Sequence, residues 1–203
     1  MKWDTTDGHS PLSSFLNKIH PLSASAIEAI DNMSFPVCIS KGRFLAKPGF
    51  TEFCYYLITK GVMRAFVKED QKDITTWINE ENEVILCGRA SSGGHNQEYV
   101  QALEDTECVG IPISVVEELF NKFPETNIAI RKLLEHCYRN AEESAFITRI
   151  PSAEKRYKRF TDTRPQLSMR ISLKYIASYL GMTLETLSRI RGKRYLASII
   201  AAN

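Results

Sequence analysis

The chain has 203 residues, of which 43% are apolar and 25% charged, a composition typical of a globular protein with one large domain or two small ones. No stretch approaches the roughly 18 consecutive apolar residues of a membrane span, and the N-terminus lacks the apolar core of a signal peptide, so we expect a cytoplasmic protein. The net charge of +2 hides a split: 12 Lys/Arg and 3 acids from Arg149 onward give +9, against −7 for residues 1–148. This split favours contact of the C-terminal third with a polyanion, and a solvated basic surface is the alternative.

The first half of the chain predicts two short helices followed by a β domain. Residues 11–33 form helical patterns broken at Pro21. From Phe35 to Cys87, short β-rich runs alternate with turns, and 98–112 supplies two further strands. Three glycines fall near even spacing in these turns, Gly42, Gly49 and Gly61. This pattern predicts an antiparallel barrel or jelly roll.

Helical periodicity returns after Pro112. A short helix is predicted up to Pro124, a long one over 126–148 and a third, capped by Ser152, over 151–160. The long helix carries a stripe that fits either an intramolecular core or a dimer seam: Ile130, Leu133, Leu134, Cys137, Ala141, Ser144 and Ile147. We expect a β domain over 1–125, a connecting and dimerisation helix over 126–148 and a DNA-binding domain over 149–203.

Cysteine and histidine usage argues against an enzyme or metal site. The five cysteines, at positions 38, 54, 87, 108 and 137, are widely spaced and without a C-x-x-C pair, which predicts reduced, buried thiols and neither a disulfide framework, a zinc site nor an iron–sulfur cluster. A metal-dependent jelly-roll enzyme needs several histidines, and His95 alone lies in the β region. We therefore predict no catalytic residues and no metal.

Residues 173–190 have the spacing of a helix–turn–helix. Ala177 is small where two crossing helices meet, Gly181 suits a left-handed turn, and Thr183 suits the N-cap of a second helix. The apolar positions lie on one face of each helix: Leu173, Ile176, Ala177 and Leu180, then Leu187 and Ile190.

The outward face of the second helix carries candidate base contacts. Arg189 pairs well with guanine, Glu185 with cytosine, and Ser188 lies beside them. An exposed Glu–Arg pair on a solvated helix is the plain alternative. The neighbours Thr183, Thr186, Arg191 and Lys193 are candidate phosphate contacts.

These features together resemble the Crp/Fnr family of bacterial transcription regulators over nearly the whole chain. "KGRFLAKPG" and "YYLITKGVMRAFV" are similar to its early β-roll strands, "ALEDTEC" to its later strand pair, and "ISLKYIASYLGMTLETLSRIRGK" to its DNA-reading unit. "AEKRYKRF" followed by "ISLKYIASYLGMT" looks most like members from Bacteroidetes. The resemblance implies an α+β fold: a β-roll (double-stranded β-helix), a long dimer helix and a winged-helix-like helix–turn–helix domain. It also implies a homodimer that binds two-fold symmetric double-stranded promoter DNA, with RNA polymerase as an expected partner, and it assigns Glu185, Ser188 and Arg189 to the family's base-contacting set.

The chain departs from this family in its ligand loop and its C-terminus. Where cyclic-nucleotide-binding members carry Arg and Ser/Thr, this chain has Asn96 and Gln97, and the Gly-Glu pair falls near Leu86 and Cys87, so control by cyclic AMP is not expected. The candidate effector pocket consists of Cys87, Arg89, Asn96 and Gln97, with an unknown effector. "YLASIIAAN" is too short for a full wing hairpin, and it either extends the last helix or packs as a stub. The alternative function is a ligand- or protein-binding module without sequence-specific DNA binding.

Overall fold

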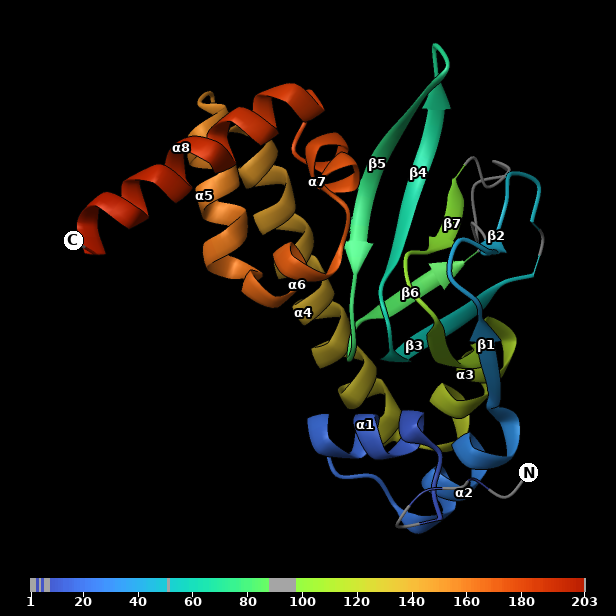
Figure 1. Cartoon of the computed structure of the whole chain (residues 1–203). Coiled ribbons are helices and arrows are strands. Elements are labelled where there is room, and N and C mark those ends of the chain that lie inside the picture. The colour runs from blue at the N-terminus through green and yellow to red at the C-terminus, as the bar shows by residue number, and fades with distance from the viewer. Residues whose placement is uncertain (1–2, 4, 6–7, 51, 88–97, 203) are drawn as a thin grey trace. The chain divides into compact units, whose positions relative to one another are not determined.

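The computed structural model describes residues 3, 5, 8–50, 52–87 and 98–202, with the side chains of 194–202 left aside. The chain forms two compact units (Figure 1). The N-terminal unit comprises Met1–Ala65 and Ile78–Asn140, and the C-terminal unit comprises Phe66–Trp77 and Ala141–Asn203. A hairpin tip from the β half of the sequence thus belongs to the C-terminal unit.

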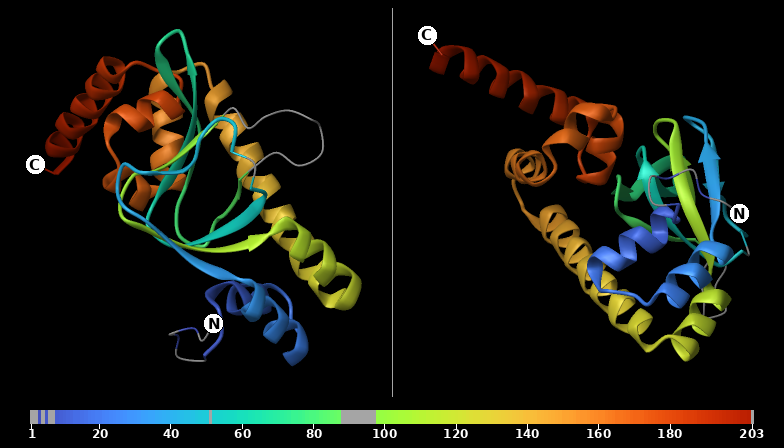
Figure 2. Two further views of the ribbon diagram at one scale, coloured as in Figure 1. Left: turned by 90° about the vertical axis from the view of Figure 1, so that its right-hand side faces the viewer. Right: turned by 90° about the horizontal axis from the view of Figure 1, so that it is seen from below.

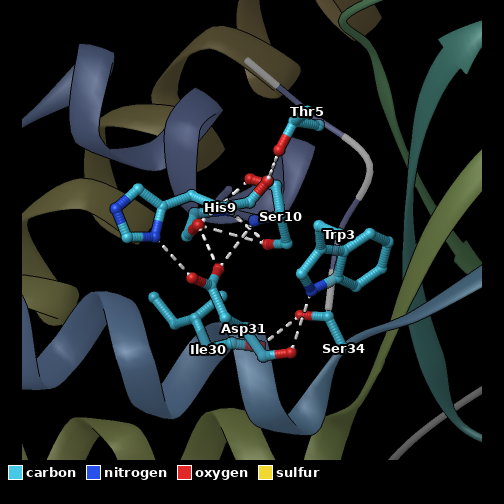
Figure 3. Close-up of polar contacts among 8 residues, drawn as sticks. Trp3, Thr5, His9, Ser10, Ile30, Asp31 and Ser34 are labelled. Carbon is cyan, nitrogen blue, oxygen red and sulfur yellow. Dashed lines mark hydrogen bonds and ion pairs between the residues drawn. The ribbon is translucent and has the colours of Figure 1, made fainter. Parts of the chain in front are cut away.

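The N-terminal unit begins with two capped helices, α1 (Pro11–Ile19) and α2 (Ala24–Met33). The side chains of Ser10 and Ser23 accept hydrogen bonds from the first turns of α1 and α2, which satisfies backbone donors that have no partner within the helix. Asp31 of α2 holds the residues before α1 in place (Figure 3): its carboxylate accepts from the Ser10 N–H at 2.9 Å and contacts His9 Nδ1 at 2.7 Å. Trp3 donates its indole N–H to the Asp31 carbonyl at 3.1 Å.

Within the described residues, eight strands form two four-stranded sheets. One has the order β1-β8-β3-β6 and the other β2-β7-β4-β5. The strands are β1 (Phe35–Ile39), β2 (Phe44–Ala46), β3 (Cys54–Lys60), β4 (Met63–Glu69), β5 (Lys72–Asn79), β6 (Val84–Cys87), β7 (Tyr99–Ala102) and β8 (Thr106–Pro112). The antiparallel β-roll expected from the glycine-punctuated runs is confirmed.

Gly110 shows how closely the first sheet is packed. It lies opposite Tyr56 in the β3–β8 ladder and opposite Phe35 in the β1–β8 ladder. A Cβ at this position would lie 2.7 Å from the Phe35 ring and 2.9 Å from the Tyr56 ring. Only a glycine allows the two aromatic rings to meet edge to face across this strand, with centroids 6.3 Å apart.

Two helices follow the β-roll, α3 (Ile113–Lys122) and α4 (Pro124–Arg149). Helix α4 is continuous over 26 residues (Figure 2). The stripe predicted on it divides: Leu133 and Ile147 are buried, whereas Leu134 and Ala141 are exposed. The inward part belongs to the cores of the two units, and the outward part is available to a partner.

The C-terminal unit contains α5 (Ala153–Thr163), α6 (Pro165–Arg170), α7 (Leu173–Tyr179) and α8 (Leu184–Ala202), together with the tip of the β4–β5 hairpin. Ser152 caps α5 as predicted, accepting from the Lys155 N–H at 3.3 Å. Helix α6 was not anticipated from the sequence. Within the described residues the C-terminus forms no wing strand, because α8 continues to Ala202; this is the helix extension that the sequence left open.

The cysteine positions and the helix hydropathy can be compared with the expectations from the sequence. All five cysteines are free; Cys54, Cys87 and Cys108 are buried, but Cys38 is exposed on β1, where the expectation of burial was wrong. Cys38 points away from the core because strand side chains alternate between faces. Among the described helices, none has the length and apolar character to cross a membrane.

Candidate nucleic-acid interface

Helices α7 and α8 are joined by a tight turn at Leu180–Thr183. Gly181 has φ +62°, a left-handed conformation that glycine adopts at low cost. The N–H groups of Gly181 and Met182 donate to the carbonyls of Ser178 and Ala177 at 3.2 and 3.0 Å, which closes the end of α7. The Thr183 hydroxyl then accepts from the Thr186 N–H at 3.1 Å, so the predicted cap of α8 is present.

The inner faces of this pair are packed into a small core. Leu187 is fully buried, and Ile190 is 7% exposed. Beneath them, the rings of Phe160 on α5 and Tyr179 on α7 lie 5.8 Å apart, and the Tyr179 hydroxyl lies 2.8 Å from that of Ser144 on α4. The orientation of α8 is therefore set by burial of these side chains.

Arg156 of α5 forms hydrogen bonds that hold the turn between α7 and α8. Its guanidinium donates to the carbonyl of Ile150 at 2.8 Å and to that of Gly181 at 3.4 Å. A long planar cation with several donors suits this double contact, which joins the end of α4 to the turn before α8.

The outer face of α8 presents the predicted base contacts to solvent. Glu185, Ser188 and Arg189 are all exposed. Within the part of the chain that the structure describes, Glu185 and Arg189 form no ion pair with each other, so the plain alternative of an i,i+4 pair is not realised here. Glu185 also lies in the first turn of α8, where an acid is favoured by the helix dipole.

The predicted phosphate contacts lie around this face. Thr183, Arg191 and Lys193 are exposed, and Thr186 is half-buried. The Thr183 and Thr186 hydroxyls are 3.0 Å apart at the N-terminus of α8, where backbone N–H groups favour an anion. The structure thus brings six exposed candidate residues and one half-buried residue onto one helix and its cap.

The tip of the β4–β5 hairpin packs against α7. The Ser178 hydroxyl accepts from the Thr75 N–H at 2.9 Å and donates to the Asp73 carbonyl at 2.8 Å. Sequence patterns gave no signal for this contact, because it joins backbone groups 103 and 105 residues away from a single serine.

Of the four residues of the candidate effector pocket, Cys87 lies within the described part of the chain. Cys87 is buried on β6, and burial, with Cys108 and Cys54 nearby, raises the pKa of its thiol to about 12, so it is a neutral, weakly polar group. Arg89, Asn96 and Gln97 lie outside the described residues. Among the described residues, no cluster of three or more His, Cys, Asp or Glu has the arrangement of a metal site.

No family model matches the chain, but known proteins resemble it in sequence and in fold. The fumarate and nitrate reduction regulatory protein of Vibrio cholerae is 24% identical over 174 residues, which cover 80% of this chain and 70% of that one. Among solved structures, FixK2 from Bradyrhizobium japonicum superimposes with a TM-score of 0.70 at 17% identity, covering 82% of this chain and 86% of FixK2. A transcriptional regulator assigned to the Crp/Fnr family, from Eubacterium rectale, superimposes with a TM-score of 0.67 at 16% identity. The match covers 91% of this chain and 88% of that one.

The chain is thus similar in sequence to Fnr-type regulatory proteins and shares its fold with a regulator of the Crp/Fnr family. The helix–turn–helix was visible from sequence spacing. Sequence spacing did not reveal three sets of polar contacts: those of Ser178 with the β4–β5 hairpin, of Arg156 with Gly181, and of Asp31 with the residues before α1. Each set joins groups that are distant in sequence.

Proposed function

We propose that this chain is a transcription regulator of the Crp/Fnr type, which binds a two-fold symmetric DNA site as a homodimer and reads it through α8. The observation that carries the proposal is the division of α8 into two faces. Leu187 and Ile190 fix the helix to the core, and Glu185, Ser188 and Arg189 face solvent without an ion pair in the described chain. A helix held in this way inserts its polar face into a major groove.

The contacts divide into base and phosphate contacts. Arg189 donates two hydrogen bonds to guanine O6 and N7, Glu185 accepts from the cytosine amino group, and Ser188 adds a polar contact to either base. Thr183, Thr186, Arg191 and Lys193 bind phosphates and hold α8 in register. The +9 charge from Arg149 onward supports this assignment, because phosphate contacts supply most of the affinity that does not depend on sequence.

Dimerisation through α4 uses Leu134 and Ala141, the outward residues of its stripe, together with Tyr138, which lies between them in sequence. Leu134 is 52% exposed and Tyr138 64% exposed, and Ala141 follows at the next step of a four-then-three spacing. This spacing is that of a coiled-coil seam. A symmetric dimer would present two copies of α8 to the two halves of a palindromic site.

The signal that controls the regulator is not cyclic AMP in this proposal, because Asn96 and Gln97 stand where the phosphate-binding residues of cyclic-nucleotide-binding members fall. RNA polymerase is the further partner, since a regulator bound at a promoter acts on the enzyme that initiates there. Binding to promoter DNA and contact with RNA polymerase both require the protein to be in the cytoplasm, where the DNA is.

The proposal is tested by selecting bound sequences from a random duplex library and measuring affinity for the winner across a salt series. We expect an inverted repeat, and an affinity for duplex DNA that falls steeply as salt rises. The same selection from genomic DNA fragments, carried out with and without a metabolite extract, reveals whether DNA binding depends on a ligand. No enrichment of any duplex, or binding indifferent to salt, would leave the alternative of a ligand- or protein-binding module.

A further inference from the structure

The N-terminal unit contains an apolar cavity of about 190 Å³. It lies between the β1-β8-β3-β6 sheet and helices α1, α3 and α4, where Leu16, Leu57, Ile111 and Val116 form part of its wall. These four side chains are each less than 7% exposed. Protein interiors are normally close-packed, with few voids larger than a water molecule, so a space of this size within a core calls for an occupant.

The wall determines the chemistry of that occupant. Among the described residues no charged side chain lines the cavity, and its polar groups are Tyr55, Thr126 and Cys137. Thr126 is already engaged, because its hydroxyl contacts the carbonyls of Phe123 at 2.6 Å and Leu119 at 3.2 Å. Burial, together with nearby Cys137 and Glu117, raises the pKa of Tyr55, so its phenol remains a neutral hydrogen-bonding group. A charged ligand would be desolvated here without a partner.

The volume of the cavity and its opening to the surface limit which ligands fit. An apolar cavity of about 150 Å³ in another protein stays dry and binds benzene; this one is somewhat larger. Two of its lining residues, Leu86 and Leu134, are 49% and 52% exposed, and they mark the side on which the cavity reaches the surface. A molecule of one or two aromatic rings with at most one hydrogen-bonding atom matches both the volume and the wall.

We propose that this cavity is a binding site for a small, uncharged aromatic molecule. Helix α4 contributes five of its lining residues: Thr126, Ile130, Leu133, Leu134 and Cys137. Occupancy therefore alters the packing of the helix that continues into the C-terminal unit. That regulatory consequence rests on the proposed function, whereas the binding itself does not.

The test uses the full-length protein without DNA and toluene as the probe. Methyl groups of Leu, Ile and Val are labelled, and their NMR shifts are followed as toluene is added. We expect saturable shifts concentrated at cavity methyls such as those of Leu16, Val116 and Leu133. Shifts spread evenly over the surface, or none up to the solubility of toluene, would overturn the proposal.

A matched pair of variants on α4 locates the site. Ile130→Phe adds volume at a residue that lines the cavity, whereas Ile128→Phe adds the same group two residues away, at a side chain that is 37% exposed and outside the lining. We expect toluene affinity to fall at least tenfold in Ile130→Phe and to stay within twofold in Ile128→Phe. Cys137→Leu narrows the same cavity from the next turns of α4 and serves if Ile130→Phe does not fold.

Two outcomes contradict the proposal even if toluene binds. Equal loss of affinity in the Ile130 and Ile128 variants would place the probe elsewhere. The cavity methyl groups could instead shift with protein concentration in the absence of toluene, with toluene no longer binding at high protein concentration. That result would show that a second copy of the chain fills the cavity. Failure of DNA binding would leave the toluene result unaffected, so the two proposals fail independently.

Discussion

The Ser178 hydroxyl bridges two backbone groups of the β4–β5 hairpin, accepting from the Thr75 N–H at 2.9 Å and donating to the Asp73 carbonyl at 2.8 Å. One side chain on α7 thus acts as a short stretch of pairing strand for β5. Thr75 is 5% exposed, so water cannot readily replace a lost acceptor. The hairpin tip and the helix before the turn are joined at this point.

Ser178→Ala is expected to loosen the hairpin tip. The Thr75 N–H loses its acceptor, which costs about 1 to 3 kcal/mol when the donor stays buried. Amide hydrogen exchange at Thr75 should quicken accordingly. Ser172→Ala is the control, because Ser172 is exposed and its side chain makes no cap hydrogen bond. Unchanged protection of Thr75 in Ser178→Ala would show that the bridge contributes nothing.

Two glycines of the helix–turn–helix unit should respond to alanine with opposite signs. Both have open space around an added Cβ, but Gly181 has φ +62° and Gly192 lies within α8. Gly181→Ala is expected to destabilise the unit by about 1 to 2 kcal/mol through backbone strain. Gly192→Ala should stabilise it by up to about 1 kcal/mol. Urea unfolding monitored by circular dichroism measures both, and equal effects would refute the role of the left-handed turn.

The Asp31 network predicts acid sensitivity of the N-terminal unit. Burial raises the pKa of Asp31, but hydrogen bonds from Ser13, the Ser10 N–H and His9 outweigh it and hold the pKa below its ordinary value of 3.8. A depressed pKa stabilises the folded state above pH 4 or so, and this contribution is lost as the pH falls through the folded-state pKa. The stability difference between the wild type and Asp31→Asn should be constant from pH 5 to 7 and shrink below about pH 4.

The control for this pH series is Asp162→Asn. Asp162 pairs with Lys158 at 2.7 Å, but both side chains are more than half exposed, and such surface pairs contribute little. Its stability difference should be small at every pH. A wild-type advantage over Asp31→Asn that persists undiminished at pH 3 would mean that the carboxylate charge is not what stabilises the network.

The dimer seam on α4 is tested by a charge at Tyr138. Tyr138→Glu would place two like charges across a symmetric seam, and we expect a shift toward monomer in light scattering at micromolar concentration, with helix content retained. Arg139→Glu is the control: its side chain is also exposed, but it lies one residue away on the helix. Dissociation by both variants, or by neither, would contradict the seam as assigned.

The sequence predicted what depends on short-range periodicity. The turn glycines of the β-roll, the capping serine at Ser152 and the Ala177–Gly181–Leu187 spacing each act within a few residues, where burial and backbone conformation leave a regular trace. The Ser178 bridge and the Asp31 network join residues separated by tens to about a hundred positions, and they leave none. The α4 stripe lies between these cases: its period was evident, but which side met the core depended on tertiary packing at Leu133 and Leu134.

The central claim is that α8 reads DNA bases through Arg189. We would compare wild type, Arg189→Ala and the charge-matched control Arg131→Ala, which lies on α4 in the N-terminal unit, for affinity to the selected operator and to random duplex. We expect Arg189→Ala to weaken operator binding by about 1 to 3 kcal/mol more than it weakens binding to random duplex. Arg131→Ala should leave both affinities unchanged. Equal losses on the two duplexes would place Arg189 on a phosphate, and no loss on either would contradict the reading of DNA by this face of α8.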